Sequence, residues 1–231
     1  MGLQLLLDSA DPKVWEEWFP SGLFTGITTN PTLLRHAGVP CTVRRLADLA
    51  ARAEQLGVKM LHLQSWGSDS HEFTDVGLEL ARLSTEKLRI YIKLPVTRAG
   101  SEAATHLIKS GLSVTFTACF EIEQILIAAS LGAAYIAPYL GRINDQGRDG
   151  HAELVEMQAC LDGMGSSCRL LAASLRNRRD LSRLAAQGLN TFTISATLAS
   201  ELFNVPATIA ASKTFEQDAC SCFQQPSIHQ T

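Results

Sequence analysis

One lysine lies inside an otherwise apolar run of the chain, residues 90–97, and its position suits covalent chemistry. The run reads IYIKLPVT and is apolar without alternation, which is typical of a parallel strand covered on both faces. A buried amine loses the hydration that stabilises its charged form, so a neutral nucleophile able to form a Schiff base with a carbonyl becomes accessible. Lys93 could also hold its ammonium in water at the strand end, or pair with a carboxylate. The octapeptide alone favours this simpler interpretation.

The composition indicates a globular protein with a sizeable core. The chain has 231 residues, of which 46% are hydrophobic and 19% charged, and its formal net charge is -3. These values argue against disorder and fit one large domain or two small ones. No long basic run is present, so we expect no nucleic-acid partner. We also expect no membrane partner, because no apolar run is long enough to span a bilayer and residues 3–7 are too short for a signal peptide.

The cysteines and histidines show no metal-binding spacing. The 6 cysteines include no C-x-x-C pair, which predicts a reducing, cytoplasmic environment with mostly structural thiols. Cys220 and Cys222 lie in a polar tail, where metal or disulfide chemistry has only weak support. We therefore expect no metal and no cofactor.

Strand-like and helix-like segments alternate along the whole chain. We expect strands at residues 3–7, 26–30, 59–64, 88–94, 113–118, 134–140, 169–173 and 191–195. Each is followed by a helical pattern, and residues 141–150 are predicted to form a longer polar loop. Eight such units in one chain of this length predict a single (β/α)8 TIM barrel, an α/β fold, with an extra C-terminal helix.

No linker or shift in composition divides the chain. The barrel is expected to span residues 1–219, and residues 220–231 to form a flexible tail. An open doubly wound sheet is the main alternative, but no G-x-G-x-x-G follows the first strand.

Nearly every predicted strand ends in a group that can form hydrogen bonds. In a barrel of this kind the chemistry takes place at the carboxyl ends of the strands. The polar residues at these ends are Asp8, Thr28, Asn30, Gln64, Lys93, Thr117, Tyr139, Ser174, Arg176 and Ser195. Hydroxyl and amide groups around one amine, with positive charge at one side, are what a sugar pocket requires.

Five segments carry a resemblance to a known family. They are LLD at 6–8, GITTNPT at 26–32, IKLPVT at 92–97, APYLGR at 137–142 and AASLR at 172–176. Their order and spacing resemble those of the transaldolase family, and of its small-subunit branch, the fructose-6-phosphate aldolases and short transaldolases. The resemblance covers residues 3–218.

The resemblance implies a class I aldol mechanism without metal. Lys93 would form an imine with the C2 carbonyl of a ketose, and the C3–C4 bond would break to leave an enamine. Asp8 would hold and help deprotonate the hydroxyl on the leaving aldehyde side. Asn30 and Thr28 would bind the hydroxyls of the dihydroxyacetone part.

A further set of residues would position water and move protons. Thr117 and Gln64 would place a water molecule, and Tyr139 would act as a general acid or base. Transaldolases usually carry glutamate and phenylalanine at the positions of Gln64 and Tyr139, whereas the aldolases carry glutamine and tyrosine. The resemblance therefore favours an aldolase that cleaves or forms a ketose phosphate such as fructose 6-phosphate, giving dihydroxyacetone and a small aldehyde.

Arg142, Ser174 and Arg176 are the expected anion site, because guanidinium groups bind tetrahedral oxyanions in a bidentate manner. A sugar phosphate is the default substrate. A sulfosugar stays open, since a sulfonate has similar geometry and the aldolase branch often has lysine in place of Arg176.

Structural readings of the same residues are also open. Asp8 could cap a loop, Asn30 could be a turn residue and Tyr139 could be a packing aromatic. Gln64 and Thr117 could satisfy backbone groups.

Two other functions compete with the aldolase. One is a transaldolase that transfers dihydroxyacetone between sugar phosphates or from a sulfosugar donor. The other is a non-catalytic barrel that binds sugar phosphates. By analogy with family members of this size, we expect a homo-oligomer, a pentamer or decamer, joined through the C-terminal helix.

Overall fold

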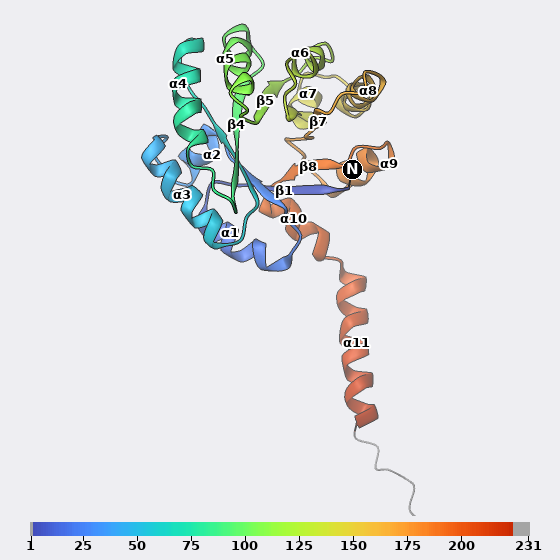
Figure 1. Ribbon diagram of the computed structural model, residues 1–231. Coiled ribbons are helices and arrows are strands. Elements are labelled where there is room, and N and C mark those ends of the chain that lie inside the picture. The colour runs from blue at the N-terminus through green and yellow to red at the C-terminus, as the bar shows by residue number, and fades with distance from the viewer. Residues whose placement is uncertain (1, 224–231) are drawn as a thin grey trace, which may run out of the picture.

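Eight parallel strands form one sheet that curves into a barrel, with helices around its outside (Figure 1). The computed structural model describes residues 2–223. The strands are β1 (Gln4–Asp8), β2 (Gly26–Thr28), β3 (Met60–Gln64), β4 (Arg89–Pro95), β5 (Val114–Cys119), β6 (Tyr135–Pro138), β7 (Arg169–Leu170) and β8 (Thr191–Ile194). They are hydrogen-bonded in the order β7-β6-β5-β4-β3-β2-β1-β8. The predicted (β/α)8 fold is confirmed.

The barrel closes between β8 and the segment that follows β7. Ala172 and Phe192 form an isolated parallel bridge. The Ala172 amide donates to the Thr191 carbonyl at 2.9 Å, and the Thr193 amide donates to the Ala172 carbonyl at 3.0 Å. The predicted seventh strand, residues 169–173, is thus regular only over its first two residues.

Helices follow the strands and cover the outer face of the barrel (Figure 1). They are α1 (Pro12–Trp18), α2 (Pro31–His36), α3 (Val43–Gln55), α4 (Ser70–Ala81), α5 (Arg98–Lys109), α6 (Gln124–Leu131), α7 (Leu140–Asp145), α8 (Gly150–Gly163), α9 (Arg178–Ala186), α10 (Ala196–Phe203) and α11 (Pro206–Phe223), with a short 3-10 helix at Phe19–Ser21. Side chains cap several of these helices where they leave a strand. For example, the Thr97 hydroxyl accepts from the Gly100 amide at 3.2 Å at the start of α5.

Two helices were not predicted from the sequence. Residues 134–140 were expected to be a strand and 141–150 a loop, but β6 ends at Pro138 and α7 occupies Leu140–Asp145. Helix α2 begins directly after Asn30, whose side chain accepts from the Leu33 amide at 2.9 Å. Proline at the first helical position supports such a start. Both helices are short and lie at the carboxyl end of the barrel, so they shape its mouth.

The apolar residues divide into a layer outside the strands and a small group inside the barrel. The outer layer joins the strands to the helices and contains most of the buried side chains. The inner group consists of Leu6, Tyr91, Tyr135, Ala137, Leu171 and Ala173. The strand period of 2 explains the division, because successive residues point to opposite faces.

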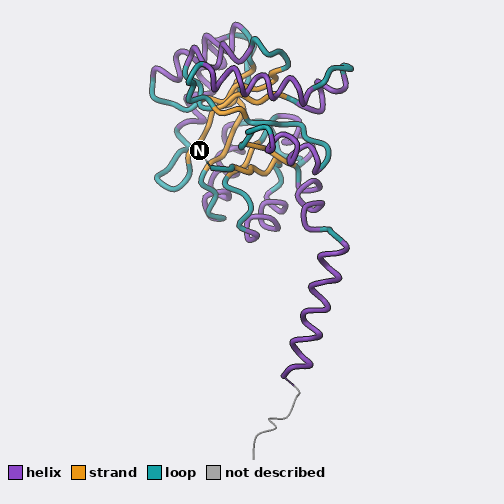
Figure 2. Tube along the Cα trace, turned by 90° about the vertical axis from the view of Figure 1, so that its right-hand side faces the viewer, coloured by secondary structure: helices purple, strands orange, loops and turns teal. Residues whose placement is uncertain are grey.

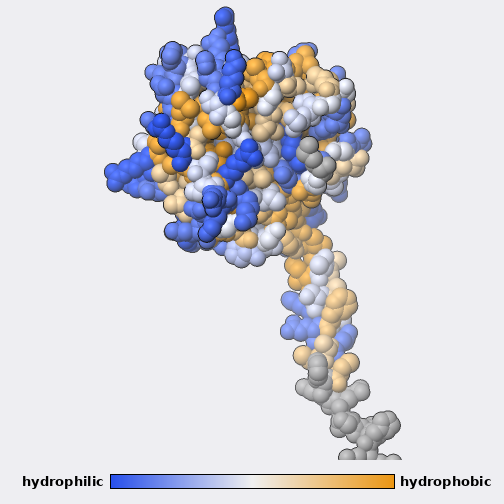
Figure 3. Space-filling view, in the orientation of Figure 1, coloured by the Kyte–Doolittle hydropathy of each residue, from blue (hydrophilic) through white to orange (hydrophobic). Residues whose placement is uncertain are grey.

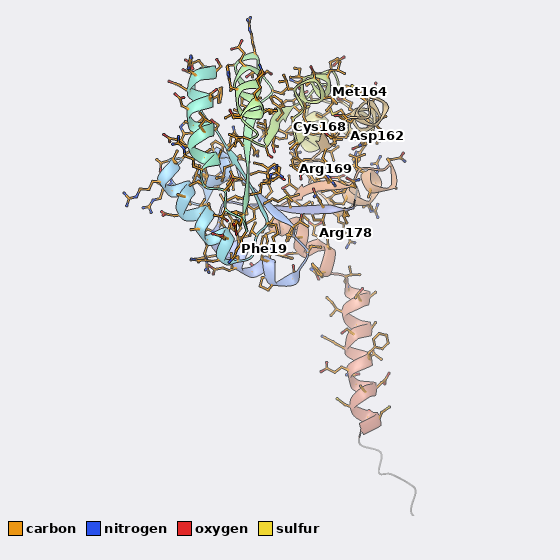
Figure 4. The ribbon with its side chains drawn as sticks, viewed as in Figure 1. Phe19, Asp162, Met164, Cys168, Arg169 and Arg178 are labelled. Carbon is orange, nitrogen blue, oxygen red and sulfur yellow. The ribbon has the colours of Figure 1, made fainter. Side chains whose placement is uncertain are left out.

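Helix α11 projects away from the barrel (Figure 2). Residues 206–222 are all exposed, and their side chains stand clear of the barrel (Figure 4). Apolar residues occur along the helix and where it leaves the barrel (Figure 3). The barrel was expected to end at residue 219 and a flexible tail to follow, but α11 continues to Phe223 and includes Cys220 and Cys222. The rest of the expected tail, residues 224–231, lies outside the described residues. No helix in the described part of the chain is long and apolar enough to cross a membrane.

Helix α5 lies so close to the end of β4 that it requires glycine at its third residue. A Cβ atom on Gly100 would lie 2.0 Å from the Pro95 carbonyl oxygen. We expect Gly100→Ala to lower the free energy of unfolding by about 2 kcal/mol, because backbone must move to relieve the overlap. Urea denaturation measures this change.

Gly163→Ala is the matched control. It lies in the last turn of α8, where an added Cβ meets nothing within 4 Å, and we expect a change within about 1 kcal/mol. Equal unfolding curves for the two variants would show that β4 and α5 are not tightly packed.

Candidate active site

A cavity of about 180 Å³ opens at the carboxyl ends of the strands. Its floor is formed by residues of β1, β2, β4 and β8, and its walls by α2 on one side and the β6–α7 and β7–α9 connections on the other. The lining residues are Asp8, Thr28, Asn30, Thr32, Leu33, His36, Lys93, Ala137, Tyr139, Arg142, Leu171, Ala173, Ser174 and Thr193. Ten residues were given a catalytic or binding role from the sequence. Seven of them are in this lining, and Gln64, Thr117 and Arg176 are not.

Lys93 lies on the inner face of β4, and its side chain is 5% exposed. Its neighbours Ile92 and Leu94 point outward into the apolar layer, so strand alternation turns the lysine toward the barrel axis. The Lys93 Nζ donates a hydrogen bond to the Thr29 carbonyl at 2.7 Å. The amine is therefore buried, held by one acceptor and in contact with the cavity.

Asp8 ends β1 and provides the carboxylate of the cavity. The Thr28 hydroxyl donates to its Oδ1 at 2.7 Å, and the Thr28 and Thr193 hydroxyl oxygens are 2.5 Å apart. Burial raises the pKa of Asp8 above its ordinary value, while the charge of Lys93 and the hydrogen bond from Thr28 act in the opposite direction. A carboxylate with a raised pKa is a stronger base than an exposed aspartate.

The Thr28 hydroxyl is already engaged with two side chains. It gives its only proton to Asp8, so toward a sugar hydroxyl it can act only as an acceptor. Asn30 caps α2 through its side-chain oxygen, which leaves its amide NH₂ as the group available to the cavity. Asn30 thus combines the turn role and a position in the cavity.

Tyr139 and Thr117 form a pair at the opposite wall. Their hydroxyl oxygens are 2.7 Å apart. The Arg142 guanidinium lies over the Tyr139 ring, 4.8 Å from its centre, and Phe120 packs edge-on against the same ring at 5.6 Å. Thr117 is buried behind Tyr139 and is not in the cavity lining. Its hydroxyl reaches the cavity only through the phenol.

Gln64 lies beside the lysine without lining the cavity. It is the Cα partner of Lys93 across the β3–β4 ladder, and partners in a parallel ladder point to the same face. The half-buried amide is therefore next to the amine, as a residue that positions water would need to be.

The expected anion site is only partly assembled. Arg142 and Ser174 line the cavity, but Arg176 lies outside the lining and both its terminal nitrogens donate to the Asp145 carboxylate. That pairing lowers the pKa of Asp145. Ser174 has a φ of 58°, which an ordinary L-residue adopts only when its surroundings enforce it.

Sequence reasoning missed several residues of the cavity. Thr32, Leu33 and His36 lie on α2, and they could not be placed because that helix was not expected. The signal was present in the Asn30–Pro31 pair, a cap followed by the preferred first helical residue. Thr193 was missed because the strand end was placed at Ser195, which instead caps α10. Within residues 2–223 no group of three His, Cys, Asp or Glu side chains is arranged to hold a metal.

The barrel therefore has a buried lysine, a half-buried aspartate and a tyrosine at its mouth. The model of the family described as Transaldolase/Fructose-6-phosphate aldolase matches residues 5–230. The chain belongs to this family. Its members are enzymes that act on carbon–carbon bonds, and the family implies a sugar phosphate as substrate.

Curated relatives of the family match this chain over nearly its whole length. A probable transaldolase of Caulobacter sp. (strain K31) is 32% identical over 219 residues, which cover 94% of this chain and 96% of the relative. A probable transaldolase of Caulobacter vibrioides is 30% identical over 222 residues, covering 96% and 99%.

Two solved structures share the fold. Thiamine phosphate pyrophosphorylase from Pyrococcus furiosus aligns with a TM-score of 0.59 at 14% identity, covering 84% of this chain and 86% of that one. A structure titled Native KDPGal structure aligns with a TM-score of 0.58 at 12% identity, covering 84% and 82%. At these identities the likeness concerns the fold alone.

The hydrogen bond from Thr28 stabilises the charged form of Asp8. Thr28→Val removes this donor, so we expect the pKa of Asp8 to rise further and its carboxylate to become protonated at a higher pH than in the wild type. NMR titration of the aspartate carboxyl carbons, with the Asp8 signal assigned through Asp8→Asn, measures the shift.

Thr25→Val is the control for this titration. The Thr25 hydroxyl donates to the Leu5 carbonyl at 3.2 Å. Leu5 is the second residue of β1, at the end of the strand away from the cavity. The Asp8 titration should not move in this variant. A Thr28→Val titration that coincides with the wild type would show that the hydroxyl does not stabilise the carboxylate.

Proposed function

We propose that this family member is a class I aldolase that cleaves or forms the C3–C4 bond of a ketose phosphate such as fructose 6-phosphate. The observation that carries the proposal is the buried Lys93 amine at the floor of the cavity, close enough to Asp8 for their charges to interact. The neutral amine adds to the C2 carbonyl, and the hydroxyl group of the adduct takes up a proton from solvent and leaves as water, which gives a protonated imine.

The protonated imine acts as an electron sink for bond cleavage. Asp8 removes the proton of the C4 hydroxyl, the C3–C4 electron pair moves toward the imine, and an aldehyde and an enamine on Lys93 result. Its raised pKa suits Asp8 to this proton transfer, because a base is most effective when its pKa approaches the working pH. Reversal of the same steps forms the bond.

Release of free dihydroxyacetone requires a proton on the enamine carbon and hydrolysis of the imine. The Tyr139–Thr117 pair supports this role, since the pair contains two hydroxyl protons and uses one of them between its own oxygens. The second can be donated to a water molecule or to the enamine. Gln64, beside the lysine, supplies a neutral amide that can hold the attacking water.

Arg142 and Ser174 are the proposed contacts to the phosphate. Both line the cavity on the side away from α2. Arg176 adds a second guanidinium if a bound phosphate displaces its Asp145 partner, and the exchange is feasible because both side chains are more than half exposed. A sulfonate has the same tetrahedral oxygens and would occupy the same contacts.

A transaldolase is the second candidate, and the names of the relatives support it. The relatives from Caulobacter that cover nearly the full chain are both described as probable transaldolases. In that reaction the enamine attacks a second aldehyde instead of being protonated, so the two functions share every step up to the enamine.

Incubation with fructose 6-phosphate, with and without erythrose 4-phosphate, separates the candidates. We expect free dihydroxyacetone without an acceptor aldehyde, and borohydride should trap the sugar fragment on the protein. Lys93→Met should abolish both signals, because it keeps the stem of the side chain and removes the amine. Turnover that requires erythrose 4-phosphate would identify a transaldolase. Substrate binding without turnover or trapping would indicate a non-catalytic barrel.

We also propose that the protein is a homo-oligomer joined through α11. A helix that makes few contacts in its own subunit is only marginally stable in water, yet α11 extends over 18 residues and Phe215 is 71% exposed. A second copy of the chain would cover this helix and the exposed Phe203 at its base.

Phe215→Glu tests this assembly. We expect the variant to sediment as a smaller species than the wild type, since a buried charge in the contact is unfavourable. Gln217→Glu adds the same charge at a polar position of the helix and should disturb the assembly less. A wild-type protein that sediments as a monomer would refute the proposal.

A further inference from the structure

Thr29 is buried beside the active site, and the mechanism above gives it no role. It follows β2 directly, is 1% exposed and is not among the residues that line the cavity. Its carbonyl nevertheless accepts the hydrogen bond from the Lys93 Nζ at 2.7 Å. Because this acceptor is buried and outside the lining, it holds the amine from the side away from the cavity.

The carbonyl belongs to a peptide group that lies between two regular elements. β2 ends at Thr28 and α2 begins at Pro31, so the ladders that β2 forms with β1 and β3 stop before this peptide. Asn30, on its other side, is extended and is held to α2 by its side chain, which accepts from the Leu33 amide at 2.9 Å. The direction of the Thr29 carbonyl therefore depends on how Thr29 itself is held.

Two donors of Thr29 meet one acceptor on β3. The Thr29 amide donates to the His62 carbonyl at 3.1 Å, and the Thr29 hydroxyl donates to the same oxygen at 3.0 Å. A residue held by its amide alone can pivot about that hydrogen bond, whereas a second bond from its side chain closes a ring and removes the rotation. The hydroxyl therefore fixes the direction of the carbonyl that Thr29 presents to Lys93.

A fixed acceptor behind the amine serves two stages of imine chemistry. A neutral primary amine attacks through its lone pair, and an N–H held away from the cavity keeps the nitrogen from rotating while it does so. The nitrogen of the protonated imine carries a single N–H, in one plane with its bonds to the lysine and the substrate. When the same carbonyl accepts this N–H, the substrate carbon lies on the cavity side. The bond is then charge-assisted and stabilises the protonated form that draws electrons from the C3–C4 bond.

We propose that Thr29 is a positioning residue for Lys93. Its hydroxyl anchors it to β3, and its carbonyl holds the N–H first of the amine and then of the protonated imine. The role belongs to imine formation and bond cleavage and not to substrate binding, since Thr29 does not line the cavity. The inference rests on the proposed function, because it assumes imine chemistry at Lys93.

Two pairs of proteins isolate the hydroxyl. The wild type and Thr29→Val have side chains of similar shape and differ in this group, and Thr29→Ser and Thr29→Ala differ in the same group. The His62 carbonyl keeps its amide donor in every variant, so no buried acceptor is left unpaired. The rate of imine formation is measured over a range of fructose 6-phosphate concentrations, by quenching with borohydride at increasing times and weighing the intact protein. The thermal midpoint of each variant is measured alongside.

In each pair we expect the protein with the hydroxyl to form the imine about tenfold faster at saturating substrate, less than the hundredfold effect of a misplacement of about 1 Å. The half-saturating concentration should change little, because the substrate contacts are intact. Thr25→Val is the matched control. The Thr25 amide and hydroxyl also donate to one carbonyl, that of Leu5, at 2.9 and 3.2 Å, but at the other end of β2. The rate of this variant should equal that of the wild type.

Equal rates of imine formation within either pair would overturn the inference, and so would a difference confined to the half-saturating concentration. A loss in Thr29→Val that Thr29→Ser shares in full would indicate a packing role alone and would also overturn it. The Ser and Ala pair carries the test if Thr29→Val does not fold. A wild-type protein that forms no trapped imine would instead refute the proposed function, so the two failures can be told apart.

Discussion

The structure of the site depends on the burial of one lysine. Lys93 is almost fully enclosed, and removing an ammonium group from water is expensive unless polar groups replace the water. The barrel supplies the Thr29 carbonyl as an acceptor and the Asp8 carboxylate as an opposite charge. The stabilisation is mutual, because the charge of Lys93 in turn limits how far burial raises the pKa of Asp8. Each group makes the burial of the other tolerable, and in the proposed mechanism both take part in the chemistry.

The walls of the cavity are built where the strands depart from regular geometry. Ala118 and Ser174 have φ values of 57° and 58°, and they follow the inner-face residues at the ends of the strands on either side of β6. Such conformations cost about 1–3 kcal/mol each for residues other than glycine. The register between β5 and β6 shifts at Ala118. Ser174 lies where the chain leaves the direction of β7 and enters the loop before α9. Tyr139 lies between these two irregular segments. It has the Thr117 hydroxyl as a partner on the β5 side and Ser174 on the β7 side of the cavity.

The strand pattern and half of the residues that line the cavity could be predicted from the sequence, since both depend on local signals. Apolar runs mark the strands, and a barrel brings their ends together, which is enough to place Asp8, Lys93 and Tyr139 in one cavity. Helices α2 and α7 were not predicted, because six-residue helices carry too little periodicity; the Asn30–Pro31 pair was the one local signal for the start of α2. The pairing of Arg176 with Asp145 joins residues 31 positions apart. It depends on the unforeseen helix α7, so the sequence could not show that one expected anion ligand has a carboxylate partner.

The difference between an aldolase and a transaldolase reduces to what reaches the enamine first, a proton or an aldehyde. In the proposed mechanism the phenol of Tyr139 is the source of the proton, since it lines the cavity and is hydrogen-bonded to a buried hydroxyl. A phenylalanine at position 139 would leave Thr117 buried without this partner, and the nearest hydroxyl would then have to act through water. The cavity is also small, about 180 Å³, and a covalently held three-carbon fragment would fill part of it. In the proposed mechanism an acceptor sugar would have to reach the enamine before protonation, and a phenol that lines the same cavity would favour protonation.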